Sequence, residues 1–384
     1  MATVAFHTLG CKVNSYESEA MLEIFKKRGY ETIDFESPAD VYVINTCTVT
    51  NTGDSKSRQM IRKAHRTNPE AVICVVGCYS QVASEEITGI EGVSVVLGTQ
   101  HRASIVDFVE EYKSTHKQIV KIENVMKVSR FEDLSIHAFE NKTRAFLKIQ
   151  DGCNNFCTYC IIPYARGGVR SRPKEDVLKQ AQELVDRGFV EIVLTGIHTA
   201  GYGVDLDNYS FYDLLVDLTT KIKGLKRLRI SSIEMSQVSD EIIELIGKSP
   251  IIVDHLHIPI QSGTDSILRR MARHYNTAEF EKKYFELKEA LPGISITTDV
   301  IVGFPGETEE DFVDTYNWIK KLHFNQLHVF PYSRRKGTPA DRMPNQVPGD
   351  IKKDRVRRLL QLSDELKTEF ALSDMNQELE VLIE

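Results

Sequence analysis

Short apolar runs alternate with helical patterns along most of the chain, and this alternation constrains the fold more than any other feature. Within residues 1–125 the runs are TVAFHTLG, DVYVINTC, AVICVVGC and VSVVLG. Runs of this kind, rich in valine and isoleucine, are typical of buried strands. Helical patterns at Tyr16–Arg28, Asp54–Arg66 and Gln81–Ile87 separate them. Because strands that alternate with helices form parallel sheets, we predict an α/β domain with a doubly wound parallel sheet.

A second alternating series occupies residues 143–376. Its strand candidates are TRAFLKIQ, EIVLTG, RLRISS, LHIPIQ, ISITTDVIVGFP and QLHVFPY, and helical patterns separate them. Six such repeats predict a partial (βα)6 barrel, because a full eight-stranded barrel typically needs about 250 residues. Residues 126–142, between the two series, are mixed and polar, so we expect a linker there.

The bulk composition is that of a globular protein, with 41% hydrophobic and 27% charged residues. No apolar stretch reaches the roughly 18 residues that a membrane helix needs, and the N-terminus lacks the layout of a signal peptide. We therefore expect a cytoplasmic protein, in which clustered cysteines serve metal binding or catalysis more often than disulfides. The net charge of −7 gives no overall sign of nucleic-acid binding.

Three cysteines stand close together in the segment DGCNNFCTYC. Cys153, Cys157 and Cys160 follow the first barrel strand and so belong to a loop at the carboxyl end of the barrel, where such folds place active sites. Structural zinc takes four protein ligands, so a zinc loop would have to borrow a distant one. Three thiolates on a four-iron cluster instead leave one iron open, as a reactive metal site requires. We therefore favour an iron–sulfur cluster over a zinc site at these three cysteines.

Four further cysteines lie in the first domain. Cys11, Cys47 and Cys78 each end a predicted strand, whereas Cys74 lies inside the run VICVV and is expected to be a small buried core residue. Ligands gather at the carboxyl ends of parallel strands, so the first three thiols are expected to converge on a second three-thiolate site. The alternative is that they are independent core cysteines.

The spacing in CNNFCTYC, with the aromatic Tyr159 before the third cysteine, resembles the signature of the radical S-adenosylmethionine superfamily. The resemblance implies that the open iron binds the amino and carboxylate groups of S-adenosylmethionine (SAM). An electron from the cluster then releases a 5′-deoxyadenosyl radical. The segments LGCKVNSYESE, VINTCTVT, PIQSGTDSILRRM and TDVIVGFPGET further resemble the methylthiotransferases of that superfamily, which carry two three-thiolate [4Fe-4S] clusters.

Within this family, TLGCKVNSYES together with QDGCNNFCTYCIIPYARG resembles the branch that modifies transfer RNA. That resemblance implies methylthiolation at C2 of N6-threonylcarbamoyladenosine, at position 37 of the anticodon stem-loop. SAM would be both methyl donor and radical source, and an electron donor such as flavodoxin or ferredoxin would reduce the cluster. Neither DNA nor a membrane is implied. Two alternatives stay open, a ribosomal-protein substrate and a non-catalytic iron–sulfur or zinc protein that binds RNA.

The resemblance also suggests residues that contact SAM. These candidates lie at the carboxyl ends of barrel strands or in the cluster loop, and they are Tyr159, Thr195, Gly196, Ser231, Ser232 and Gln261. An ordinary strand-to-loop glycine is the alternative for Gly196.

Two groups of basic residues are candidates for RNA contact. Residues 144–174 hold six basic residues and one acidic residue, which a solvated basic loop would also explain. Because both groups follow barrel strands, we expect them to flank the mouth of the barrel and contact phosphates. The candidates are Arg166, Arg170, Arg172, Arg334, Arg335 and Lys336.

The last residues, 377–384, contain the apolar run ELEVLIE. This run resembles the first strand of the small TRAM β-barrel that usually ends a methylthiotransferase. We therefore expect that barrel to be absent or truncated in this chain.

Overall fold

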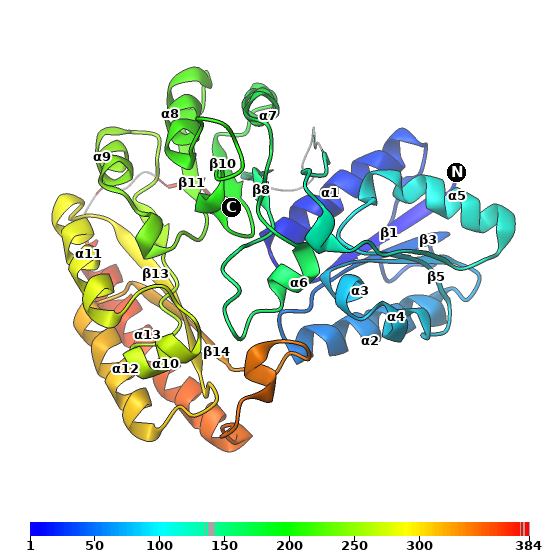
Figure 1. Cartoon of the computed structure of the whole chain (residues 1–384). Helices are drawn as coiled ribbons and strands as arrows, with labels where there is room; N and C mark the ends of the chain where they lie inside the picture. The colour runs from blue at the N-terminus through cyan, green and yellow to red at the C-terminus, as the bar shows by residue number, and fades with distance from the viewer. Residues whose placement is uncertain (135, 137–142, 377, 379–380, 384) are drawn as a thin grey trace.

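The computed structural model describes residues 1–384 except 135, 137–142, 377, 379–380 and 384. Figure 1 shows an N-terminal α/β domain, coloured blue to cyan, packed beside a larger barrel-like domain that runs from green to red. Half of the expected start of a TRAM barrel, residues 377, 379–380 and 384, lies outside the described residues, and the described residues 378 and 381–383 form no strand.

The N-terminal domain contains a six-stranded parallel sheet in the order β2-β1-β3-β4-β5-β6. Its strands are β1 (Thr3–Thr8), β2 (Glu31–Thr32), β3 (Val41–Thr46), β4 (Val72–Gly77), β5 (Val93–Leu97) and β6 (Ile119–Lys121). All residues of β3 and β4 are buried, because helices cover both faces of the sheet. The predicted doubly wound sheet is confirmed.

The helices of this domain divide between the two faces of the sheet. They are α1 (Lys12–Lys27), α2 (Asn51–Thr67), α3 (Cys78–Val82), α4 (Ser84–Thr88) and α5 (Ile105–Thr115). Side chains of α1 and α5 share one hydrophobic cluster, and side chains of α2, α3 and α4 share the other. Cys74 is buried in the first of these clusters, as its position in an apolar run predicts.

Two helices differ from the sequence pattern. The first begins at Lys12 rather than Tyr16, because Cys11 is extended and occupies the N-cap position directly after the strand and turn. The region 81–87 forms two short helices instead of one, since Ala83 leaves the helical conformation with φ −137° and ψ 41°. In both regions a cysteine stands at the start of a helix: Cys11 is the N-cap of α1, and Cys78 is the first residue of α3.

The second domain contains two three-stranded parallel sheets, β11-β10-β7 and β12-β13-β14. Its strands are β7 (Ala145–Lys148), β10 (Glu191–Thr195), β11 (Arg227–Ile230), β12 (His255–His257), β13 (Ser295–Val302) and β14 (Gln326–Pro331). Parallel bridges between Leu228 and Ile252 and between Ser232 and His257 join the two sheets. The six strands therefore form the expected partial barrel.

Helices surround this barrel on its outer side (Figure 1). They are α7 (Lys174–Asp186), α8 (Phe211–Lys221), α9 (Asp240–Lys248), α10 (Asp265–Arg270), α11 (Thr277–Ala290), α12 (Glu309–Leu322) and α13 (Gly349–Ser373). Along β13 buried and half-buried residues alternate strictly. The buried residues Ile296, Val300 and Val302 belong to the main hydrophobic cluster, in which helices such as α11 and α12 also take part.

A small hairpin encloses the first cysteine loop. Its strands are β8 (Gln150–Asp151) and β9 (Arg170–Ser171), which pair antiparallel, and the short helix α6 (Ile162–Arg166) lies between them in sequence. In Figure 1, α6 lies at the junction of the two domains, where it contacts α3. The hairpin thus places the cysteine loop against the N-terminal domain.

The two domains also share packing away from this loop. Tyr16 and Ala20 of α1 belong to the hydrophobic cluster of the barrel. The Tyr16 hydroxyl donates to the Leu134 carbonyl at 2.8 Å. Leu134 and Ile136, within the expected linker 126–142, are buried in the same cluster, while residues 135 and 137–142 lie outside the described residues. Part of this segment is therefore packed against the barrel, while Met126, Lys127, Ser129, Arg130 and Asp133 are exposed.

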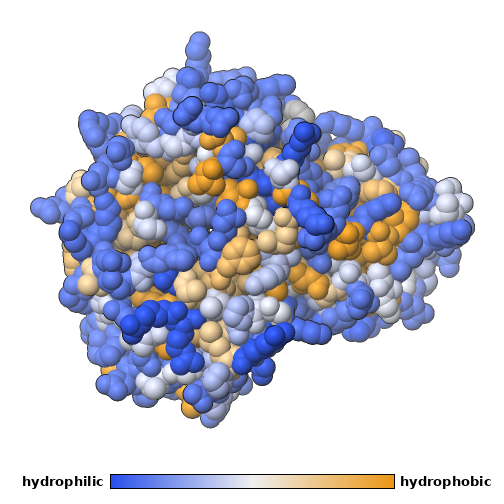
Figure 2. All heavy atoms as spheres, in the orientation of Figure 1, coloured by the Kyte–Doolittle hydropathy of each residue, from blue (hydrophilic) through white to orange (hydrophobic). Residues whose placement is uncertain are grey.

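The surface shown in Figure 2 is mostly hydrophilic, with hydrophobic residues in separate patches. Among the described residues, no helix has both the length and the apolar character needed to cross a membrane.

Candidate active site between the two domains

The three N-terminal cysteines converge because their strands are neighbours in the sheet. Cys11 follows β1, Cys47 follows β3 and Cys78 follows β4. Burial is the main reason that the pKa of the Cys78 thiol is raised to about 12. The sulfurs of Cys11 and Cys47 lie near enough to raise this pKa further, so the three thiols share one neighbourhood. We call these residues the N-terminal triad.

Gly10 permits the close approach of the first two members. It has φ +109°, a conformation that side chains disfavour, and an added Cβ would lie 2.9 Å from the Cβ of Cys47 and 3.1 Å from its sulfur. A larger residue would therefore push the β1 turn away from Cys47.

The other three cysteines lie in one loop, which we call the barrel triad. The Cys153 amide donates to the Gly167 carbonyl at 3.0 Å, and the Thr158 amide donates to the Met271 carbonyl at 3.0 Å. These bonds anchor the loop at both ends. Burial raises the pKa of Cys153 to about 11 and that of Cys160 to about 12, with the neighbouring thiols adding to the shift of Cys160.

The donor sets fit clusters better than single ions. Within the described ranges, no three histidine, cysteine or carboxylate side chains gather closely enough to hold one metal ion. The ligands of one zinc ion all surround a single point, whereas the thiolates of a four-iron cluster bind different irons and stand farther apart. Two groups of three free thiols, none of them in a disulfide, therefore fit two clusters that each keep one iron open.

Each triad has a buried guanidinium beside one of its sulfurs. The Nε of Arg166 donates to the Cys78 sulfur at 3.2 Å, and the Nη1 of Arg273 lies 3.5 Å from the Cys157 sulfur. Hydrogen bonds to ligand sulfurs are one of the ways in which a protein tunes an iron–sulfur cluster. Sequence reasoning missed Arg273, because it lies in the basic run RRMARH, which looks like a solvated surface.

Arg166 belongs to a buried charge network that connects the two domains. Glu17 of α1 accepts from Lys148 at 2.7 Å and from Arg166 at 2.8 Å, and it also pairs with Arg102. Asp151 accepts from Lys148 at 2.6 Å and from Arg166 at 3.1 Å. Burial alone would raise the pKa of the Glu17 carboxyl, but the two guanidinium groups hold that pKa well below its usual range.

Three of the six basic residues predicted to contact RNA lie in the protein interior. Arg166, Arg170 and Arg172 are each 2% exposed or less. The Nη1 of Arg170 donates to the Gly168 carbonyl at 2.9 Å, and Arg172 donates to Gln180. An RNA phosphate cannot reach these groups, so the predicted contact is wrong for them: their charges serve the junction of the domains instead.

The second predicted group, Arg334, Arg335 and Lys336, contains both buried and exposed residues. Arg335 is also buried, and its Nη2 donates to Asp54 and Thr48 of the N-terminal domain, at 2.6 Å each. Arg335 is thus a contact between domains rather than an RNA contact. Arg334 and Lys336 are exposed, and Arg334 donates to Asp341 at 3.0 Å.

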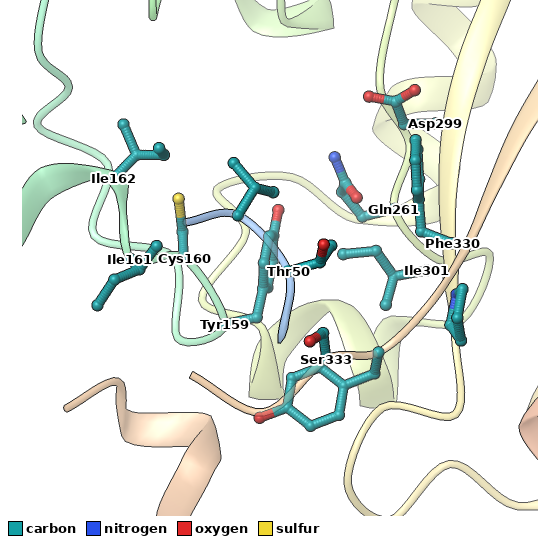
Figure 3. A pocket seen from close by; sticks show the side chains of 13 residues that line it. Thr50, Tyr159, Cys160, Ile161, Ile162, Gln261, Asp299, Ile301, Phe330 and Ser333 are labelled. Carbon is teal, nitrogen blue, oxygen red and sulfur yellow. The ribbon is translucent and has the colours of Figure 1, made fainter. Parts of the chain in front are cut away.

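A pocket of about 240 Å³ opens beside Cys160. Val49 and Thr50, two and three residues after Cys47, line it from the N-terminal domain. In Figure 3 the Cys160 sulfur stands on one side of the pocket and Gln261 and Asp299 stand across it. The pocket therefore adjoins the barrel triad and the segment that carries one member of the N-terminal triad.

Only some of the candidates for SAM contact line the pocket. Tyr159 and Gln261 line the pocket. Ser231 is buried and its hydroxyl has no partner among the described residues, whereas Ser232 is exposed.

The remaining two candidates lie at the end of β10. The buried Thr195 hydroxyl donates to the Val193 carbonyl at 3.2 Å, so it is already satisfied. An added Cβ on Gly196 would lie 2.9 Å from Gln150, which leaves room only for backbone there.

Buried polar atoms without partners lie on Arg273, beside Cys157, and on other residues of the barrel domain. In the described part of the chain, the Nε and Nη2 of Arg273 have no hydrogen-bond partner although they are buried. The Ser231 and Thr199 hydroxyls are likewise unpaired. Buried polar groups are nearly always satisfied, so these donors fit the amino-acid end of a bound SAM.

Comparison with known proteins identifies the family. Residues 147–319 match the Radical SAM superfamily, and residues 3–98 match the uncharacterized protein family UPF0004. The chain is 58% identical, over all of its length and 85% of the relative, to "Threonylcarbamoyladenosine tRNA methylthiotransferase MtaB" of Bacillus subtilis. It is 38% identical, over 98% of its length and 86% of the relative, to "tRNA-2-methylthio-N(6)-dimethylallyladenosine synthase" of Moorella thermoacetica.

Among solved structures, the radical SAM methyltransferase TsrM from Kitasatospora setae, with cobalamin and a [4Fe-4S] cluster bound, resembles the chain with a TM-score of 0.66. The two share 14% identity over 89% of this chain and 77% of that one, so this likeness shows the fold alone. The sequence relatives identify the family, which the fold alone cannot do, because they match the chain over 98% or more of its length. The chain therefore belongs to the methylthiotransferase family of radical SAM enzymes.

Proposed function

We propose that this chain transfers a methylthio group to C2 of N6-threonylcarbamoyladenosine at position 37 of transfer RNA, in the cytoplasm. The single observation that carries the proposal is the 58% identity, over the whole chain, to an MtaB-type enzyme named for that substrate. The placement of two free cysteine triads at one junction between domains supports it.

SAM and [4Fe-4S] clusters are the cofactors of this family, and the triads are the residues that would hold the clusters. Cys153, Cys157 and Cys160 would hold the cluster that, with SAM, supplies the radical, and the N-terminal triad would hold the cluster that supplies the methylthio sulfur. C2 of adenine carries an unactivated C–H bond, which no side-chain base removes at a useful rate. Cofactors supply that difficult chemistry, and the protein positions the reactants.

The lining of the pocket suits a radical reaction. Ile161, Ile162 and Ile301 line the pocket beside Cys160 and present apolar surface to it. Once a substrate fills the pocket, an apolar lining helps to exclude water and to prevent side reactions of reactive intermediates. Gln261 and Asp299, across the pocket, are the polar groups available to orient a nucleoside there.

The buried unpaired donors supply the SAM contacts in this proposal. Arg273 would bind the methionine carboxylate, since a guanidinium pairs well with a carboxylate. Ser231 and Gln261 would bind further polar groups of SAM, and the backbone around Gly196 would line its site.

RNA would approach from the exposed side of the pocket. Phe330 lines the pocket yet is 45% exposed, so its ring offers a stacking face for a base that has left the anticodon loop. Arg334 and Lys336, which follow the pocket residue Ser333, are placed to contact phosphates. An electron donor of the flavodoxin or ferredoxin class completes the set of partners.

The test is anaerobic turnover with synthetic anticodon stem-loops. The reconstituted enzyme is incubated with SAM, a reductant and stem-loops that carry threonylcarbamoyladenosine, isopentenyladenosine or plain adenosine at position 37. Nucleoside mass spectrometry should detect a methylthio product from the first substrate alone. A product on a ribosomal protein, or none on any stem-loop although SAM is cleaved, would overturn the proposal.

A further inference from the structure

Arg166 connects the two cysteine triads in a way that its sequence position does not reveal. It ends α6, six residues after Cys160 of the barrel triad, yet its Nε donates to the sulfur of Cys78 in the N-terminal triad at 3.2 Å. The side chain is fully buried. One short segment of the barrel domain thus carries a ligand of one site and contacts a ligand of the other.

The rest of the guanidinium is fixed by other partners. Nη1 donates to Glu17 at 2.8 Å and to Asp151 at 3.1 Å, while Nη2 donates to Asn14 at 2.9 Å and to Glu17 at 3.0 Å. Because a guanidinium is planar and rigid, these bonds also determine where the Nε–H points. The contact with Cys78 is therefore held by the whole network.

The charges around this contact favour an anionic sulfur. Four cations and three carboxylates make up the buried network: Arg102, Lys148, Arg166, Arg170, Glu17, Asp151 and Glu132. A cluster thiolate at Cys78 would add an anionic partner to the Arg166 guanidinium. Charge-assisted hydrogen bonds of this kind are roughly twice as strong as neutral ones.

We propose that Arg166 is a positioning residue for the second cluster, holding the Cys78 thiolate in place and raising the reduction potential of the cluster bound by the N-terminal triad. The inference rests on the proposed function only in assuming a cluster at that site. A hydrogen bond from a cation stabilises the more negative, reduced cluster more than the oxidised one, so the potential rises. Through α6, the same residue sets the position of one cluster relative to the other.

The experiment uses the full chain with Cys153, Cys157 and Cys160 replaced by alanine, so that only the second site binds a cluster. After anaerobic reconstitution, the midpoint potential is measured by redox titration followed by electron paramagnetic resonance. Arg166→Lys and Arg166→Gln should each shift the potential to more negative values at unchanged iron content. An unchanged potential would overturn the proposal.

Lys148→Met is the matched control, because Lys148 is a cation of the same network but does not contact a sulfur. It should shift the potential less than Arg166→Gln does. Equal shifts would mean that the network acts by total charge and that the sulfur contact has no special role, which would also contradict the proposal.

A second measurement needs no substitution at Arg166. The same three-alanine protein, labelled with 15N-arginine, is reduced and studied by pulsed electron paramagnetic resonance. A hyperfine coupling to an arginine nitrogen at the remaining cluster is expected, and its absence would overturn the proposal even if the Arg166 variants failed to fold. Turnover is not measured in either experiment, so failure here is distinguishable from failure of the proposed function.

Discussion

The two cysteine triads are assembled by different routes. The barrel triad comes from one loop of eight residues, 153–160, which backbone hydrogen bonds anchor to Gly167 and Met271 of the same domain. The N-terminal triad comes from three strand ends spread over residues 11–78, and a residue of the other domain contacts one of its sulfurs. A local motif can therefore form its site within one loop, whereas the dispersed triad depends on the sheet, on Gly10 and on the docking of the domains.

Removing one ligand from each site gives the largest expected effect. Cys157→Ala and Cys78→Ala should each reduce the iron of the reconstituted protein from about eight to about four atoms per chain, because each [4Fe-4S] cluster is lost as a unit. Iron and sulfide analysis measures this. Cys74→Ala, in the core and outside both triads, is the control and should retain about eight. Full iron content in Cys78→Ala would contradict the prediction that the N-terminal triad binds a second cluster.

Breaking the buried charge network that connects the domains should affect the N-terminal triad more than the barrel triad. Glu17→Ala removes one carboxylate from three buried cations, which keep only Asp151 or Glu132, and this costs about 3–5 kcal/mol of unfolding free energy. Denaturant unfolding of the metal-free protein measures the loss. Glu244→Ala, which removes an exposed partner of Lys248, should cost less than about 1 kcal/mol. Similar costs for the two variants would show that the network does not hold the domains together.

Gly10→Ala tests the close approach inside the N-terminal triad. The added methyl would press on Cys47 in a left-handed backbone conformation, with an expected cost of about 1–3 kcal/mol and partial loss of iron from the second site only. Gly29→Ala is the matched control, since Gly29 also has a positive φ but nothing lies within 4 Å of an added Cβ. Iron content per chain should fall for Gly10→Ala and stay unchanged for Gly29→Ala. Equal iron in both would contradict the close-approach argument.

The smallest effect is expected at the rim of the pocket, which belongs to neither triad. Lys336→Ala should weaken binding of the anticodon stem-loop and reduce the slope of log affinity against log salt by about 1, as loss of one phosphate contact does. Iron content should not change. Lys223→Ala, on the loop between α8 and β11, is the control. If both variants lowered the salt slope equally, the rim would have no particular role in RNA binding.

Much of the fold could be predicted from the sequence, because strand ends can be located in it. Cys11, Cys47 and Cys78 end three apolar runs, and the rule that parallel strands present ligands at their carboxyl ends brings them together. The six-strand barrel follows from the same alternation of strands and helices. These inferences need only local patterns and a general rule of topology.

The buried arginines could not be predicted in this way. Basic residues are almost always exposed, so Arg166, Arg170 and Arg172 look like an RNA-binding patch in the sequence. The burial of Arg166 depends on Glu17, which precedes it by 149 residues, and that of Arg170 and Arg172 depends on other partners such as Asp151 and Gln180. One signal was present, since Glu17 stands next to Tyr16 and one helical turn before the apolar Ala20 and Met21, and a carboxylate on such a face needs a buried cation.

The most direct test of the account is complementation between the two triads. One variant carries alanine at all three cysteines of the barrel triad, and the other carries alanine at all three of the N-terminal triad. Each is assayed alone, and then both are mixed, on the threonylcarbamoyladenosine stem-loop by nucleoside mass spectrometry. If both clusters must serve one substrate at one junction within one chain, only the wild-type protein forms the methylthio product. Product from the mixture, or from either variant alone, would contradict the account.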